Sequence, residues 1–163
     1  MTDPTTRPVV NLADVALRDQ SHGDRFAAKI GRVGPLIGST AIGCMYTVVA
    51  PGKRAFPFHV HHVIHELFVI LEGAGEYRFG DQVYPIKAGD VCAAPTGGPE
   101  RAHQIVNTGA GDLKYLGIST HSDTELVEYP DSNKFAVSGK TSDGGRIRFI
   151  GRMDGNVDYW DGE

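Results

Sequence analysis

Residues 52–73 read GKRAFPFHVHHVIHELFVILEG and combine a cluster of histidines with a strongly apolar run. On a β-strand, residues two positions apart point to the same face, so His59 and His61 can converge on one point. Glu66 lies five positions after His61, and an unbroken strand would place it on the opposite face. We therefore predict a turn or bulge at residues 62–65, after which a new strand begins at Glu66.

The apolar run after Glu66 bears on the chemistry of this stretch. The residues LFVIL supply no charged partner, so an ionised Glu66 entering that core requires one from elsewhere. Two histidines at positions i and i+2 are, by themselves, more typical of solvated or hydrogen-bonded surface residues. A carboxylate that joins two imidazoles on one face is instead typical of a metal site, since all three groups are ligands for a transition-metal ion.

The chain around this stretch is rich in short β-type segments. Twenty-one glycines and nine prolines favour many strands joined by tight turns over long helices. Gly80-Asp81, between two β-rich runs, predicts a hairpin. The pattern predicts an all-β closed barrel or double-sheet jelly roll. The expected strands lie within residues 26–33, 41–50, 65–73, 75–80, 82–86, 90–95, 103–107 and 113–120.

The two ends of the chain carry weaker patterns. Residues 1–24 are polar and interrupted by proline, which indicates an irregular N-terminal arm. The C-terminal tail after Val137 is rich in Gly and Asp, with one further possible strand at residues 146–153. Tyr159 and Trp160 form a large apolar pair, which we expect to dock back on the barrel.

Composition excludes several classes of partner. The formal net charge is −4 and no long basic block is present, so neither nucleic acid nor an anionic membrane is expected as a partner. No stretch approaches the roughly 20 apolar residues of a membrane-spanning helix, and the N-terminal residues do not read as a signal peptide. A cytoplasmic protein is therefore expected. In that setting Cys44 and Cys92 should be free thiols, whereas a secreted protein could join them.

Residues 52–73 resemble the first sequence motif of the cupin superfamily. That motif places a Gly before a His-x-His pair, then a Glu, and a second Gly seven residues after the Glu. Gly52, His59, His61, Glu66 and Gly73 match it, with Gly52 one residue further from His59 than usual.

Residues 89–107, GDVCAAPTGGPERAHQIVN, resemble the second cupin motif. Gly89, Pro95, Gly97, His103 and Asn107 match its positions, and the segment GPERA is three residues longer than usual before the histidine. The gap of 15 residues between the motifs is similar to that of small bacterial cupins. The resemblance implies a single-domain cupin barrel over 1–163, with its core at about 26–120.

The resemblance also implies a ligand set. Cupins use three histidines and one glutamate at these motif positions, which here are His59, His61, Glu66 and His103. Such a set suits one divalent transition-metal ion, and the sequence leaves Zn, Mn, Fe and Ni open. Small cupins are commonly homodimers, so we expect a homodimer that uses residues 1–40.

Five further side chains are candidates for binding or converting a substrate. His65 could be catalytic or could orient another group, although an exposed loop histidine is an equal alternative. Arg101, in the inserted loop, is the best candidate to hold an anionic group, with Lys53 and Arg54 as weaker ones; a solvated arginine is the alternative. Tyr46 could line the barrel as a substrate-binding residue or belong to its ordinary core. The polar residues 121–134 are expected to form a surface loop.

The cupin barrel serves several activities, so the fold leaves function open. The first hypothesis is a metal-dependent sugar-phosphate isomerase with a small polar carbohydrate as substrate, because the chain is similar to cupins related to phosphomannose isomerase. The alternatives are a metal-dependent oxygenase and a non-catalytic small-molecule-binding cupin.

Overall fold

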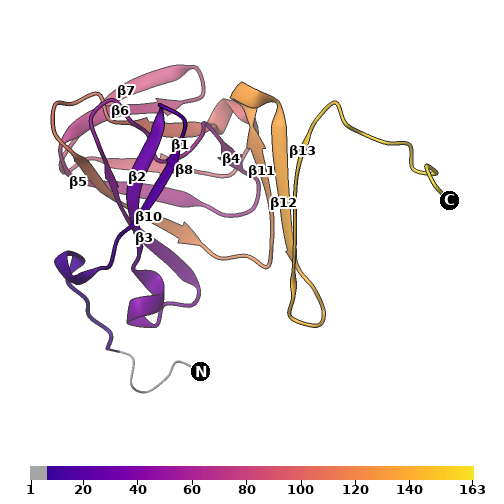
Figure 1. Cartoon of the computed structure of the whole chain (residues 1–163), viewed down its shortest axis with the longest axis horizontal. Coiled ribbons are helices and arrows are strands. Elements are labelled where there is room, and N and C mark those ends of the chain that lie inside the picture. Colours follow the sequence, from indigo (N-terminus) through magenta and orange to yellow (C-terminus); the bar gives the residue numbers. More distant parts are fainter. Residues whose placement is uncertain (1–6) are drawn as a thin grey trace.

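A computed structural model describes residues 7–163, and nearly all of its regular structure is β (Figure 1). Its helical elements are short 3₁₀ turns: η1 Leu12–Asp14, η2 Gly34–Ile37, η3 Pro99–Arg101 and η4 Pro130–Ser132. The strands are β1 Arg18–His22, β2 Phe26–Arg32, β3 Ile42–Val49, β4 Val60–His61, β5 Glu66–Glu72, β6 Ala74–Phe79, β7 Gln82–Lys87, β8 Val91–Ala94, β9 His103–Val106, β10 Leu113–Thr120, β11 Thr124–Tyr129, β12 Lys134–Lys140 and β13 Arg146–Arg152. Within the described residues, no helix is long and apolar enough to cross a membrane.

Antiparallel sheets enclose one core. A six-stranded sheet runs in the order β1-β2-β3-β10-β5-β8, and a three-stranded sheet runs β7-β6-β9. Side chains from both sheets form a single buried cluster, in which Val49, Ile70, Leu113 and Tyr115 are at most 2% exposed. Alternate residues of each strand supply this cluster, as expected for sheets with one buried face. The chain therefore adopts the all-β architecture of packed antiparallel sheets that the sequence indicated.

The local predictions for the barrel are confirmed. Each of the eight expected segments contains a strand, and β6 and β7 pair as a hairpin around Gly80-Asp81. Residues 62–65 lie outside any strand and separate β4 from β5, so the predicted bend is present. Cys44 and Cys92 are free thiols.

Gly73, at the end of the first motif, is required by a close backbone contact. Its φ is +83°, in the left-handed region that favours glycine. A Cβ at this position would meet the carbonyl oxygen of Asp112 at 2.4 Å. The motif glycine therefore allows β5 to turn into β6 directly against the segment that leads into β10.

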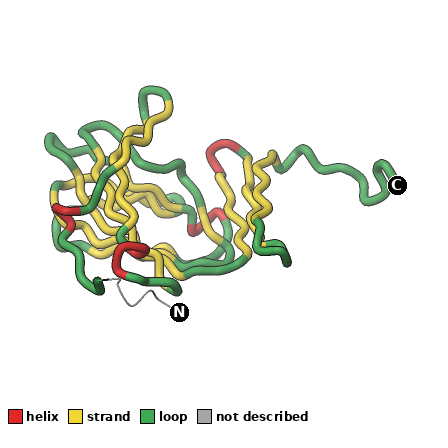
Figure 2. Tube along the Cα trace, turned by 60° about the horizontal axis from the view of Figure 1, so that its bottom comes forward, coloured by secondary structure: helices red, strands yellow, loops and turns green. Residues whose placement is uncertain are grey.

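A third sheet extends beyond the barrel. Strands β13-β12-β11-β4 form it, and β4 is the strand that carries His61 (Figure 2). A bidentate ion pair between Arg78 of β6 and Asp131 of η4, at 2.7 and 3.0 Å, connects this extension to the barrel. We call the antiparallel pair β12–β13 the C-terminal hairpin.

Several expectations for the two ends were wrong. The polar segment 121–134 is not a loop, because TELVEY pairs as β11 with both β4 and β12. Thr124, Val127 and Tyr129 are residue types that favour strands, but the polar composition of the segment obscured this signal. The expected irregular N-terminal arm contains β1, while its residues 1–6 lie outside the described part of the chain.

Tyr159 and Trp160 do not dock on the barrel. They are 84% and 71% exposed, and their rings contact each other edge to face at a centroid distance of 4.8 Å. The chain after β13 leads away from the body of the molecule, which removes the surface on which they were expected to pack (Figure 1). The strand expected at 146–153 is present as β13.

Asn107, the last residue of the second motif, is fully buried and connects three segments. Its side-chain amide donates to the carbonyls of Val49 at 2.7 Å and Gly111 at 2.8 Å, while its Oδ1 accepts from Gly109 N at 2.9 Å. We expect Asn107→Ala to lower the free energy of unfolding by about 3 kcal/mol or more, because these buried partners lose their hydrogen bonds. Urea unfolding measures the change, with exposed Asn156→Ala as the matched control. Equal stability of the two variants would contradict the role of this network.

Candidate metal centre

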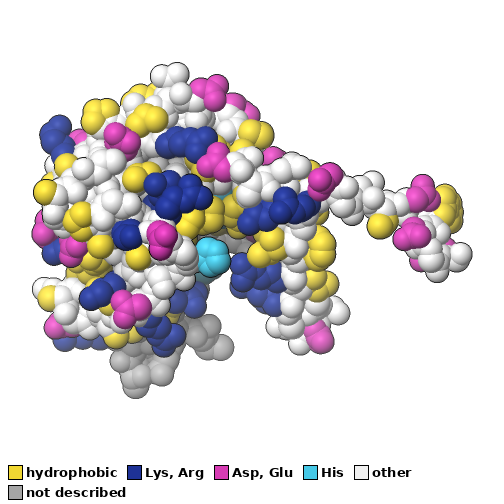
Figure 3. Space-filling model, turned by 45° about the horizontal axis from the view of Figure 1, so that its top comes forward, with side chains coloured by type: hydrophobic (Ala, Val, Ile, Leu, Met, Phe, Trp, Pro, Cys, Tyr) yellow, Lys and Arg dark blue, Asp and Glu magenta, His cyan; other side chains and the backbone are white. Residues whose placement is uncertain are grey.

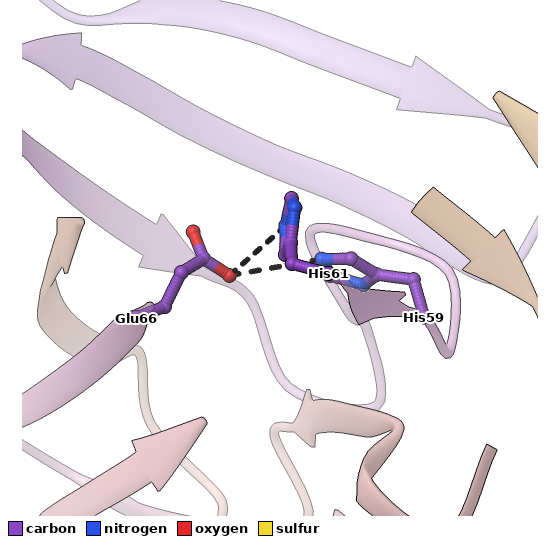
Figure 4. A group of neighbouring side chains, drawn as sticks. All are labelled: His59, His61 and Glu66. Atoms are coloured by element: carbon purple, nitrogen blue, oxygen red, sulfur yellow. Dashed lines mark ion pairs between the residues drawn. The ribbon is translucent and has the colours of Figure 1, made fainter. Parts of the chain in front are cut away.

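Three imidazoles converge on one carboxylate oxygen. The Nε2 atoms of His59, His61 and His103 lie 3.8, 3.3 and 3.2 Å from Oε2 of Glu66. His59, His61 and Glu66 each offer a ligand atom, and these atoms all lie within 4.8 Å of one another. Figure 4 shows the two imidazoles and the carboxylate turned toward a common point. The structure thus brings together the four residues that the motifs singled out.

Backbone pairing places these ligands at a seam between sheets. His59 and His103 form an isolated antiparallel bridge, with N–H···O distances of 3.2 and 2.7 Å between their backbones. His103 begins β9, so this bridge joins the three-stranded sheet to the segment leading into β4. His61 ends β4 and Glu66 begins β5 after the bend. Because the chain bends at residues 62–65, Glu66 points to the same side as the histidines, as the sequence required.

Burial and the neighbouring charges act in opposite directions on the Glu66 carboxyl. Burial raises its pKa, but hydrogen bonds from His103 and His61 and the charges of the histidines outweigh this effect and hold the pKa well below its usual range. Glu66 is therefore ionised at any ordinary pH and available as an anionic ligand.

The pKa values of His59 and His61 move in opposite directions. Burial, reinforced by the neighbouring histidines, lowers the pKa of His59 to about 4. Burial also lowers the pKa of His61, but hydrogen bonding to Glu66 and the charges of Glu66 and Glu125 reverse this effect and raise it overall. His59 is thus neutral and ready to coordinate near neutral pH, whereas protons compete more strongly for His61.

The donor set fits a divalent transition-metal ion. Three imidazole nitrogens and one carboxylate oxygen are the ligands that Zn, Mn, Fe and Ni accept. His59 Nδ1 contacts the Pro57 carbonyl at 2.8 Å, which fixes the ring and leaves Nε2 to coordinate. Within residues 7–163, Nδ1 of both His61 and His103 is buried without a hydrogen-bond partner. His59, His61, Glu66 and His103 are therefore the residues that would hold an ion here.

We call the four residues His59, His61, Glu66 and His103 the metal group. They open onto a large pocket between the barrel and the C-terminal hairpin. Its volume is about 770 Å³, and Figure 3 shows a hollow in this region with histidine and basic side chains at its edge. His61, Glu125 and Tyr129 line one side. The remaining lining comes from Arg32, Ile64, Ser119, Thr120, His121, Ser122, Asp123, Val127, Ala136, Val137, Ser138, Lys140, Gly144, Gly145, Arg146 and Arg148.

Comparison with known proteins agrees with this geometry. Residues 45–119 match the cupin domain family. Residues 45–119 therefore form a cupin domain. The cupin match contains both motifs and all four metal-group residues, and it ends before β11.

Relatives of this cupin carry different functional names. It is 40% identical over 68 residues to an oxalate-binding protein of Thermotoga maritima, which covers 42% of this chain and 54% of that protein. The two curated relatives that it matches are covered over less than two thirds of their length, at 54% and 65%.

Two solved structures extend the likeness over nearly the whole chain. A candidate sugar phosphate isomerase of Acidithiobacillus ferrooxidans has a TM-score of 0.79 at 23% identity, covering 94% of this chain and 97% of that one. A cupin-superfamily sugar phosphate isomerase of Silicibacter pomeroyi has a TM-score of 0.77 at 24% identity, covering 94% and 98%. At these identities the likeness shows the fold.

The other predicted site residues lie away from the cupin's pocket lining. His65 is exposed and immediately precedes inward-facing Glu66. Its backbone N–H donates to Thr120 Oγ1 at 2.9 Å, and its carbonyl oxygen accepts from Thr120 N at 3.0 Å. Tyr46 lies on the opposite face of β3 from fully buried Thr47, so strand alternation directs it away from the core. The structure does not bring His65 or Tyr46 to the metal group.

The predicted basic residues also point elsewhere. Arg101 is exposed beside Glu100, with 3.8 Å between its Nε and the carboxylate, and it lies over Gly97. The Lys53 ammonium donates to the carbonyl oxygen of Asp24. Neither side chain lines the pocket, and neither does Arg54.

Glu125 is a residue that the sequence interpretation missed. Its carboxylate accepts from the backbone N–H groups of His62, Val63 and Ile64 at 3.2, 3.1 and 2.8 Å, which fixes the bend between β4 and β5. Its Oε2 also lies 3.6 Å from Nδ1 of His61. Glu125 therefore positions a metal ligand and the bend next to it. The strand-favouring residues of TELVEY were the available signal, because a strand there could bring Glu125 beside the bend.

We expect Glu125→Gln to weaken metal binding by about 10- to 100-fold, as is usual when a group that orients a ligand is changed. The glutamine side chain carries no charge to face Nδ1 of His61. Its amide oxygen also accepts weaker hydrogen bonds from the backbone N–H groups of residues 62–64. Calorimetric titration with Zn²⁺ measures the effect. Glu128→Gln is the matched control, since Glu128 lies on the same strand but contacts His62 Nε2 at 2.6 Å. Equal affinities in the two variants would exclude this role for Glu125.

Proposed function

We propose that this cupin is a metal-dependent sugar-phosphate isomerase that acts on a small polar carbohydrate. One observation carries the proposal: His61 belongs both to the metal group and to the wall of the pocket of about 770 Å³. A pocket of that size accommodates a small metabolite. The names of the two structural neighbours support the same reaction class.

The residues around the pocket suit a polyhydroxylated substrate. A bound divalent ion would supply Lewis-acid polarisation of a carbonyl and its adjacent hydroxyl. Ser119, Thr120 and Tyr129 present hydroxyl groups on the lining, and these can hydrogen-bond to sugar hydroxyls. Burial raises the pKa of Tyr129, so its hydroxyl is held protonated and can donate.

The test is aldose–ketose interconversion by the metal-loaded protein, followed by NMR over a panel of pentose and hexose phosphates. We expect turnover of at least one sugar phosphate, its loss on metal removal, and its loss in His103→Ala. His22→Ala, an exposed histidine on β1, should retain activity. The absence of both turnover and thermal stabilisation across the panel would exclude the isomerase.

One comparison favours a second candidate function. The match to an oxalate-binding protein covers the motif region, so the same metal group could serve to bind a small dicarboxylate without turnover. Thermal stabilisation by oxalate, without stabilisation by any sugar phosphate, would support that alternative. Oxygen uptake by the iron-loaded protein on substrate addition would instead support the oxygenase.

We also propose that the protein is a homodimer, as the resemblance to small cupins implies. Strand β1 is an edge of the six-stranded sheet, and all five of its residues are exposed. An open edge strand can pair with a second copy. Light scattering should give twice the chain mass of 17.6 kDa, and a mass equal to one chain would exclude the dimer.

A further inference from the structure

The C-terminal hairpin presents a row of basic side chains to the pocket. The pairing of β12 with β13 places Arg148 opposite Ser138 and Arg146 opposite Lys140. All four residues line the pocket, whereas Ile147, between the two arginines, does not. Strand alternation therefore explains why Arg146 and Arg148, two positions apart on β13, both face the pocket.

Positive charge on this pocket is only partly compensated. Two carboxylates belong to the lining, and both are engaged: Asp123 pairs with Lys140 at 3.3 Å, and Glu125 accepts from the bend. Arg32, Arg146 and Arg148 also line the pocket, and none of the three forms an ion pair with any residue that the structure describes. Three unpaired guanidinium groups around one cavity create a field that attracts anions.

Tyr129 connects this basic wall to the metal group. Its ring stacks on His59 with a centroid distance of 6.2 Å and an interplanar angle of 28°. The charge of Arg148 acts on the Tyr129 hydroxyl and lowers its pKa against the larger effect of burial. One tyrosine ring thus lies between the arginine and a ligand histidine, a separation that suits the two ends of one small substrate.

We propose that Arg146 and Arg148 of the C-terminal hairpin, together with Arg32, form a phosphate-binding site in the same pocket as the metal group. The substrate's phosphate binds at the hairpin, and its carbonyl end lies toward His61. This assignment rests on the proposed isomerase activity, which identifies the bound anion as the phosphate group of a sugar phosphate. It replaces Arg101 and Lys53, whose side chains lie outside the pocket, as the basic clamp. Arginine suits this role because its planar guanidinium forms paired hydrogen bonds with phosphate oxygens.

The test uses inorganic phosphate as the probe on the metal-loaded, full-length protein. Calorimetry at a fixed ionic strength of about 0.15 M keeps the screening of exposed charges constant. We expect the double variant Arg146→Gln/Arg148→Gln to weaken phosphate binding by about 10-fold or more, with metal stoichiometry unchanged. Arg152→Gln is the matched control, because Arg152 lies on the same face of β13 but outside the pocket lining, and it donates to the Ser132 carbonyl.

Activity measurements separate the two proposals. If a sugar phosphate is turned over, its KM should rise in the double variant by a similar factor, with a smaller change in kcat. Loss of phosphate binding in the double variant supports the site even if no sugar phosphate is isomerised. Phosphate binding equal to that of the parent protein, or equally weakened in Arg152→Gln, would overturn the site even if the isomerase activity is found.

Discussion

Replacing His61 by alanine should abolish stoichiometric metal binding. His61 Nε2 lies 3.3 Å from Oε2 of Glu66, and this imidazole is the metal ligand that also lines the pocket. Its removal leaves two imidazoles and a carboxylate. Loss of a direct ligand costs more than loss of an orienting group, so we expect affinity to fall by more than about 100-fold.

Elemental analysis of the purified variant, together with Zn²⁺ titration, measures this effect. The matched control is His22→Ala, which removes an exposed imidazole from β1 and should leave one ion per chain. Circular dichroism establishes that both variants retain the β-rich fold. One ion per chain in His61→Ala would falsify the ligand assignment.

Acidification should release the metal in a defined pH range. Because the pKa of His61 is raised, a proton competes with the ion at a higher pH than it would at an ordinary histidine, whose pKa is about 6.5. His59, with its pKa lowered to about 4, stays neutral over that range, and Glu66 stays ionised. Because His61 must lose a proton to coordinate, we expect Kd to be at least about 30-fold higher at pH 5 than at pH 7.

A series of chelator-competition titrations between pH 7.5 and pH 4.5 measures the profile. Affinity should fall by about 10-fold per pH unit or more below pH 6.5, and the metal-free protein should remain folded throughout. A Kd that does not change across this range would show that metal binding does not displace a proton from His61. Glu125→Gln should shift the onset to lower pH, because it removes one charge that raises the pKa of His61.

The metal group was predictable from local rules. Strand parity placed His59 and His61 on one face, and the same parity required the bend that residues 62–65 adopt. His103 came from the motif resemblance. Its backbone bridge to His59 is a long-range contact that no local pattern encodes.

The pocket could not be predicted in the same way. Glu125 approaches His61 only because β11 pairs with β4, 60 or more residues away in the chain, as the contacts of Glu125 with His62 and Val63 show. The polar composition around β11 resembled a loop, and the orientation of Arg146 and Arg148 depends on the register of β12 with β13. Pairing register between distant strands is set by the whole fold. Arg101, Lys53 and Arg54, the basic residues that the sequence indicated, therefore lie outside the pocket lining.

The backbone bridge between His59 and His103 has a consequence for how the ion is exchanged. Main-chain hydrogen bonds fix the distance between His59 and His103 before any ion binds. The Glu66 carboxylate already holds the imidazoles near one point. Metal binding therefore does not have to provide the free energy of folding, unlike in small domains that collapse only around their ion. A chelator should strip the protein without unfolding it, and the same folded sample can then be reloaded with Zn, Mn, Fe or Ni in turn. Each loaded form can then be compared on one preparation of the protein, which isolates the effect of the metal from that of the fold.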